Sequence, residues 1–260
     1  MGTGIVGIAK VLVPLLIAVS AGAELPGALR AGQEAFYAAY AAWDLSGFKE
    51  AARHFEQACE AAPEGYPAQY WLGAARFHVV LHRNRARAPW NEVKELIESA
   101  EDVLKRAVEL NDGDAEAHAM LATLTGMRIS EKPLAAVWLG PRVMKHRRAA
   151  EKHGAENPRV HYLAGAGYLL GDRGREEKAL AHFERALELF PEEAKRDRPD
   201  WAPTWGHANC LAFAGQACQR LARVEQARAY FEQALEKNPR NRLAREGMKA
   251  IGAPREEPRP

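Results

Sequence analysis

Apolar side chains recur at three- and four-residue spacing along almost the whole chain after residue 24, and no stretch alternates apolar with polar positions. This period predicts helices rather than strands. The last such stripe consists of Ala227, Tyr230, Phe231, Ala234 and Leu235. Proline, glycine and asparagine interrupt the stripes, and these interruptions predict ten or eleven helices. We therefore expect an all-α fold.

The stripes share one spacing. Alanine, phenylalanine, alanine and proline stand at offsets 0, 4, 7 and 12 from Ala51, Ala179 and Ala227, and the same grid with conservative changes starts at Ala100. Small residues let two helices approach closely, the aromatic side chain fills the space between helix pairs, and the proline ends the second helix of a pair. On this reasoning Pro191 marks the end of a helix.

These offsets resemble the tetratricopeptide repeat (TPR) family, whose unit is a helix-turn-helix of about 34 residues. The segments 186–191 and 234–239 are very similar to the family's ending of the second helix. The resemblance covers roughly residues 30 to 250. It implies a TPR-like α-solenoid of about five helix-turn-helix units, and we assign residues 24–252 to this helical repeat domain.

The units are longer than the family's repeat. The marker positions Ala51, Ala100, His146, Ala179 and Ala227 stand 49, 46, 33 and 48 residues apart. The extra residues fall in the segments 79–95, 127–142 and 192–204. Insertions in a solenoid gather on one face or end, often the binding one. Segments 139–141 and 200–207 are also similar to those of a secreted bacterial subfamily of tetratricopeptide proteins.

The first residues have the layout of a secretory signal. Lys10 precedes the apolar run 11–20, and the small residues 21–23 follow it. This order predicts a signal peptide at residues 1–23, a periplasmic or secreted protein, and no stable membrane span in the mature form. An uncleaved anchor broken by Lys10 is the alternative. The last segment, 253–260, is proline-rich and without a stripe, so we expect a disordered tail.

Composition narrows the function classes. The chain is 47% hydrophobic and 27% charged, which argues against a disordered, collagen-like or multi-span membrane protein. Its net charge of +2 offers no global field for nucleic acid, so we expect no such partner. Two local basic clusters could meet phosphate, anionic lipid or an acidic partner, although a solvated helix surface explains them better. They are Arg83, Arg85 and Arg87, and Arg142, Lys145, Arg147, Arg148 and Lys152.

The sequence shows no catalytic motif, and we expect a protein that is not an enzyme and that binds no cofactor or metal. His78 and His82 have the spacing of metal ligands on a helix, but no further ligand accompanies them. Cys210 and Cys218 would be about 12 Å apart on one helix, too far for a disulfide, and Cys218 fits a buried thiol. A disulfide between Cys59 and one of them is left open.

Function is therefore expected at the surface. The first helix of each pair lines the concave face of a TPR array, which suits a peptide segment. By helical spacing, five side chains point outward on that face and are our predicted partner-binding residues: Tyr40, Tyr70, Phe77, Gln216 and Arg220. A rival surface is formed by the insertions around Trp138, Trp201 and Trp205, whose tryptophans could instead hold long loops to the solenoid.

Three functions remain open at this point. The first is a scaffold or adaptor of the bacterial cell envelope that binds a protein or peptide on the concave face. The second is a structural subunit of an envelope complex that uses its insertions. The third is an accessory solute-binding protein, which would need a deep closed pocket. The sequence leaves the partner's identity and the oligomeric state open.

Overall fold

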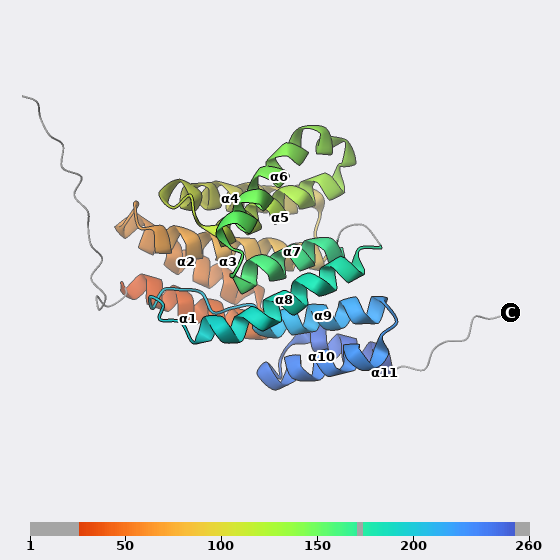
Figure 1. The fold of residues 1–260 in the computed structure, drawn as a ribbon. Helices are drawn as coiled ribbons and strands as arrows, with labels where there is room; N and C mark the ends of the chain where they lie inside the picture. Colours follow the sequence, from red (N-terminus) through yellow and green to blue (C-terminus); the bar gives the residue numbers. More distant parts are fainter. Residues whose placement is uncertain (1–25, 171–173, 253–260) are drawn as a thin grey trace, which may run out of the picture.

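The computed structural model describes residues 26–170 and 174–252, and in them the chain is all α-helical, as predicted (Figure 1). The helices are α1 (Gly27–Ala42), α2 (Leu45–Ala61), α3 (Tyr66–Arg85), α4 (Trp90–Leu110), α5 (Ala115–Glu131), α6 (Ala136–His153), α7 (Pro158–Leu170), α8 (Glu176–Ala194), α9 (His207–Arg220), α10 (Val224–Lys237) and α11 (Arg242–Gly252). A 3-10 turn, η1 (Pro133–Ala135), precedes α6.

Consecutive helices pack in pairs. The pairs are α1–α2, α3–α4, α5–α6, α7–α8 and α9–α10, and α11 packs against α9 and α10. The first helices of neighbouring pairs also contact each other, from α1 through α3, α5 and α7 to α9. This arrangement confirms the expected solenoid of about five helix-turn-helix units. We call the side lined by these first helices the inner face.

Local sequence explains where several helices begin. Asp44 precedes α2, and its carboxylate accepts the backbone N–H groups of Ser46 and Gly47 at 3.3 and 2.9 Å. Asp114 precedes α5 and accepts those of Glu116 and Ala117 at 3.1 and 3.0 Å. Such side chains satisfy N–H groups that have no partner inside the helix.

Small residues bring the two helices of a pair together, as the spacing predicted. A Cβ atom on Gly215 of α9 would lie 2.6 Å from the Phe231 ring of α10. One on Gly247 of α11 would approach the same ring to 2.2 Å, and one on Gly73 of α3 would lie 2.5 Å from Leu104 of α4. These positions have no room for a larger side chain, because the partner side chain fills the seam.

The insertions mostly lengthen helices. Helices α3 and α4 have 20 and 21 residues, and the second insertion extends α5 and α6 around η1. The expectation that Pro191 ends its helix is wrong, since α8 continues to Ala194. The added turn carries Glu193, which is buried and paired with Arg159, and this pair stabilises helix beyond the proline. The third insertion then continues as a loop, residues 195–206, which we call the inner loop.

The two ends of the array are bonded to each other. Asn238, in the turn between α10 and α11, donates through Nδ2 to the carbonyl oxygen of Ala41 in α1 at 3.0 Å. Arg85 of α3 forms an ion pair with Glu246 of α11 at 2.6 Å. The first and last parts of the array therefore meet at these two contacts.

Two predicted segments, the signal peptide at 1–23 and the tail at 253–260, lie outside the described residues. Within residues 26–170 and 174–252, no helix combines the length and apolar character needed to cross a bilayer.

Candidate functional site

The inner loop occupies the inner face. The carbonyl oxygen of Trp201 accepts hydrogen bonds from Trp71 Nε1 at 2.7 Å and from Gln33 Nε2 at 3.1 Å. The backbone N–H of Thr204 donates to the hydroxyl of Tyr37 at 2.9 Å. The loop follows α8 in the chain, yet its partners here belong to α1 and α3. It therefore links the fourth unit to the first two across the inner face.

Trp205, the last bulky residue of the inner loop, lies in the core. It is only 2% exposed, and its Nε1 donates to the hydroxyl of Tyr70 at 3.2 Å. Its ring centroid lies 5.2 Å from that of His78, 6.1 Å from Tyr40 and 6.3 Å from Tyr162. Aromatic pairs at such separations stabilise a core beyond their buried area. Trp205 thus fills the space that an open groove would offer to a peptide.

A buried ionic cluster lies beside Trp205. Arg159 of α7 is 1% exposed and lies between two carboxylates. Its Nε donates to Glu116 Oε1 at 2.7 Å, and its Nη1 donates to Glu193 Oε2 at 3.0 Å. Tyr70 and Asn157 also donate to Glu116. Charges buried in this way are tolerated because each has a partner, and removal of one partner leaves the others uncompensated.

The same cluster holds the inner loop. Arg159 Nη1 donates to the carbonyl oxygen of Trp205 at 3.3 Å, and its guanidinium lies 5.9 Å from the Trp205 ring centroid. Arg198 of the loop pairs with Glu193 at 2.8 Å. Gly206 joins the loop to α9 with φ +117°, a conformation that favours glycine. The loop is therefore fixed by charge, by packing and by backbone conformation.

Burial sets the protonation states in this interior. Burial opposes the charge of Arg159, but Glu116, Tyr70 and Glu193 together outweigh it, and the pKa of Arg159 rises further above its ordinary value. Burial and the Glu116 carboxylate raise the pKa of Tyr70 well above its usual range. Burial lowers the pKa of His78 to about 4, while its Nδ1 contacts the carbonyl oxygen of Ala74 at 2.7 Å. At neutral pH these groups are fixed as a cation, a phenol and a neutral imidazole, which suits packing.

The structure separates the five predicted partner-binding residues. The expectation that Tyr70 and Phe77 face a partner is wrong, because both are buried in the core. Tyr40 is partly buried and its hydroxyl is enclosed. Gln216 is partly exposed and Arg220 is exposed, both on α9, and Arg220 Nη1 donates to the carbonyl oxygen of Leu169. Arg220 is thus the most exposed of the five, while Tyr40 and Gln216 are intermediate.

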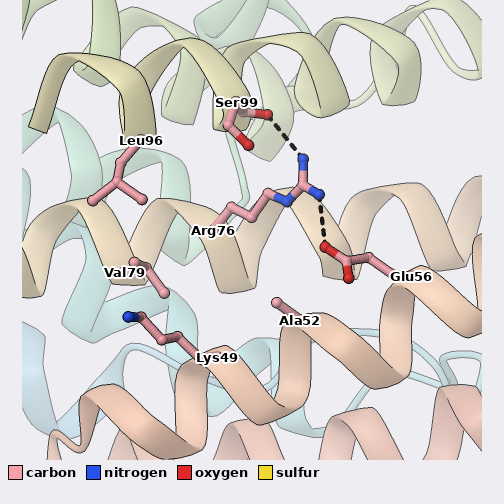
Figure 2. Close-up of a pocket in the computed structure, with 7 residues that line it drawn as sticks. All are labelled: Lys49, Ala52, Glu56, Arg76, Val79, Leu96 and Ser99. Carbon is pink, nitrogen blue, oxygen red and sulfur yellow. Dashed lines mark hydrogen bonds and ion pairs between the residues drawn. The ribbon is translucent and has the colours of Figure 1, made fainter. Parts of the chain in front are cut away.

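A hollow not predicted from the sequence lies between the first two units (Figure 2). Its volume is about 240 Å³, and it is open to solvent. Arg76 at its edge pairs with Glu56 at 2.7 Å and donates to the carbonyl oxygen of Ser99 at 3.3 Å, while Lys49 lies at the other end. The lining residues are Lys49, Ala52, Glu56, Arg76, Val79, Leu96 and Ser99. Its size and mixed lining suit one side chain of a partner rather than an enclosed solute.

The cysteines and the histidine pair singled out in the sequence are packing residues in the structure. The three cysteines are free: Cys210 and Cys218 are buried, and Cys59 is half-buried. In the part of the chain that the structure describes, no three His, Cys, Asp or Glu side chains gather where they could hold a metal ion. His78 is a core residue, and His82 at the predicted spacing packs against the ring of Trp43, with centroids 6.3 Å apart.

Sequence reasoning missed the ionic cluster. Glu116 and Arg159 occur near the first turns of α5 and α7, where charged residues are ordinarily solvated, and 43 positions separate them. Glu193 lies 34 positions further along the chain from Arg159. The one local signal is the pair of tryptophans in segment 200–207, which predicts a possible anchor for the loop. Trp205 confirms that anchoring role.

Comparison with protein families identifies two units directly. A tetratricopeptide repeat family model matches residues 160–193 and 208–241, which correspond to α7–α8 and α9–α10. Among curated proteins, none matches the chain significantly.

One solved structure supports the fold. The chain is similar to TTC0263, described as a thermophilic TPR protein of Thermus thermophilus, with 20% identity and a TM-score of 0.60, over 87% of this chain and 98% of that one. It is also matched to MamA, with 18% identity and a TM-score of 0.39, over 89% and 96% of the two chains. YrrB, a TPR protein with an unusual peptide-binding site, is matched at 17% identity and a TM-score of 0.39, over 86% and 98%.

Proposed function

We propose that this chain, which contains tetratricopeptide repeats, is a non-enzymatic protein–protein interaction scaffold of the bacterial cell envelope. Repeat arrays of this kind present extended surfaces that suit peptide or helical segments of a partner. The envelope location rests on the predicted signal peptide at residues 1–23. The scaffold function rests on the fold and on the surface that the inner loop leaves accessible.

One observation carries the choice of surface: the chain's own inner loop fills the inner face around Trp205. A partner on the concave side is therefore held at the rim rather than in the interior. The rim is formed by Gln216 and Arg220 of α9 together with Leu170, the last residue of α7, which is 63% exposed. We call these three residues the α7–α9 rim.

The rim has the composition of an interface anchor. Arg220 donates one N–H group to the carbonyl oxygen of Leu169, and a guanidinium has five N–H donors. The remaining donors suit a carboxylate or a backbone carbonyl of the partner. Leu170 adds an apolar contact beside it, and Gln216 offers both a donor and an acceptor. Arginine beside an exposed apolar side chain is a common source of binding energy.

Crosslinking in the native envelope, followed by pull-down, tests this proposal. The double variant Gln216→Ala and Arg220→Ala should reduce capture of a discrete partner by about tenfold or more, as expected for an interface anchor. The matched control changes Arg185 and Gln226 to alanine, because both are exposed on second helices away from the rim. Both variants should keep a nearly unchanged melting temperature. Equal capture by the rim variant and the control would show that the partner binds elsewhere.

A second function is favoured by one specific feature. The α5–α6 hairpin exposes large apolar side chains, as a structural subunit that docks through its insertions would. The solute-binding alternative receives less support. The hollow in Figure 2 and a second one between α1 and α2 are both open at the surface, whereas a solute-binding protein encloses its ligand.

A further inference from the structure

The end of the α5–α6 hairpin carries the main group of exposed large apolar side chains in the described residues. Leu134 is 82% exposed, Val137 is 80% exposed and Trp138 is 62% exposed. Met144, two turns further along α6, is also exposed. We call residues 132–148 the α5–α6 tip. In Figure 1 the hairpin projects away from the rest of the array, in green, so this end is free to meet a flat surface.

The apolar side chains are exposed although this end of the hairpin is well packed. On the opposite side of the same helix, Leu139 and Val143 are buried. Helix α6 therefore has a packed face against α5 and a second, outward apolar face at its first turns. A soluble surface ordinarily places polar residues on such a face, and exposed apolar groups of this size mark an interaction site.

Cations surround the outward face. Lys132, Arg142, Lys145 and Arg148 are all exposed, and within the described residues the structure gives none of these four an ion pair. Residues 131–152 contain six lysines and arginines but only two glutamates, whereas the whole chain is nearly balanced. The positive charge is thus concentrated where the apolar side chains are exposed.

The order of these residues along α6 matches the depth profile of a bilayer surface. Val137 and Trp138 belong to the first turn, and Arg142, Lys145 and Arg148 follow roughly 6, 10 and 15 Å further along the axis at 1.5 Å per residue. A peripheral segment buries its apolar side chains about 5 to 10 Å deep, and its lysines and arginines reach the lipid phosphates. Tryptophan prefers this interface.

We propose that the α5–α6 tip docks the protein on an anionic lipid surface. This inference goes beyond the proposed scaffold function and does not depend on it. The positive charge of the α5–α6 tip favours lipid docking over self-association of two copies of the chain. In a two-fold contact between two copies, each tip would face the cations of the other, and such like charges repel. An anionic membrane provides the opposite charge and an apolar layer together. A protein partner is the outcome that the experiment must distinguish.

The test uses the full chain and sedimentation with two kinds of vesicle, pure phosphatidylcholine and phosphatidylcholine with about 30% phosphatidylglycerol. We expect tighter binding to the anionic vesicles, weakened by salt. Trp138→Ser should weaken this binding about tenfold, because a buried large side chain contributes that much. Lys145→Gln with Arg148→Gln should weaken it about 25-fold, at about fivefold for each cation.

The control variant must lose two positive charges at a site away from the α5–α6 tip. Lys178→Gln with Arg185→Gln removes two exposed cations from α8 and should leave anionic binding within about twofold, because attraction to the lipid falls off within a Debye length. All variants share residues 1–25, so the contribution of that segment is common to them. Amide hydrogen exchange localises the contact: anionic vesicles should protect η1 and the first turn of α6.

Three results would overturn the proposal. The first is equal binding of the two vesicle types. The second is unchanged binding of both tip variants, with no protection in residues 132–148. The third is a dimer in sedimentation that Trp138→Ser converts to a monomer, or a crosslink from residue 138 to a protein in the envelope but none to lipid. Circular dichroism and melting temperature verify that the exposed substitutions leave the fold intact.

Discussion

The inner loop and the α5–α6 tip are both additions to the basic repeat, and each carries tryptophan near proline, yet the two tryptophans have opposite surroundings. Trp205 is enclosed by Tyr70, His78 and Arg159, and its indole N–H has a partner. Trp138 is exposed among cations. The comparison shows that an insertion turns inward only where distant helices supply partners for its polar groups. Where none exist, its side chains remain available to an outside surface.

The largest expected effect is in the buried ionic cluster. Arg159→Met should lower the free energy of unfolding by about 3 to 5 kcal/mol, because Glu116 and Glu193 are then buried without their cation. Urea unfolding at neutral pH measures this loss. Arg148→Met in the α5–α6 tip is the matched control and should change stability by less than about 0.5 kcal/mol. Equal effects would mean that Arg159 is solvated.

The next largest difference in stability is expected between variants of Trp205 and Trp138. Trp205→Ala should lower the free energy of unfolding by at least about 3 kcal/mol, since it empties the space between five aromatic or basic side chains. Trp138→Ala should lower it by less than about 0.5 kcal/mol. Thermal and urea unfolding of both variants under one set of conditions check this. A small loss for Trp205→Ala would show that the inner loop is not fixed in the interior.

Acid should weaken the interior through His78. Its pKa of about 4 in the folded protein lies below the ordinary 6.5, so the unfolded chain binds more protons between these values. Stability from this group is therefore present above pH 6.5 and is lost as the pH falls through 4. His78→Asn should reduce the difference in unfolding free energy between about pH 7 and about pH 4.5 by roughly 2 kcal/mol. An unchanged pH dependence in this variant would argue that His78 is accessible and protonated normally.

The smallest effect concerns a single contact of the inner loop. Tyr37→Phe removes the hydroxyl that accepts from the Thr204 backbone N–H at 2.9 Å and from the Thr204 hydroxyl at 3.0 Å. We expect a loss of about 1 kcal/mol, because both hydrogen bonds lie at exposed positions, together with faster amide exchange at Thr204. Tyr168→Phe on α7 is a suitable control, because no hydrogen bond of its hydroxyl is seen among the described residues. Slow exchange at Thr204 in both proteins would mean that other contacts hold the loop.

The features that recur in every unit could be predicted from the sequence. The spacing of Phe231 and Gly215 predicted the helix pairs and their close seams, because these contacts recur in every unit and involve near neighbours in the chain. The direction of Tyr70 and Phe77 could not be predicted in the same way. Helical spacing predicts their direction only for an open concave face, and the inner loop fills that face beside Tyr70.

The buried ionic cluster could not be predicted from local sequence patterns for a related reason. Arg159 and Glu116 become partners only after two units stack, and nothing in their own neighbourhoods marks them as buried. The same limit applied to the tryptophans: Trp138 and Trp205 occur in similar insertions, and only the distant partners distinguish them. Gln216 and Arg220 remain predicted partner-binding residues, now at the α7–α9 rim.

Tryptophan fluorescence tests the central claim, that the inner loop is buried while the α5–α6 tip is exposed, most directly. Difference spectra of Trp205→Phe and Trp138→Phe against the unchanged protein, with and without acrylamide, isolate the two indoles. The structure predicts that the emission lost in Trp205→Phe is at short wavelength and resists quenching. The emission lost in Trp138→Phe should be at long wavelength and be strongly quenched. Two long-wavelength, equally quenched components would contradict the filled interior and would restore an open concave face.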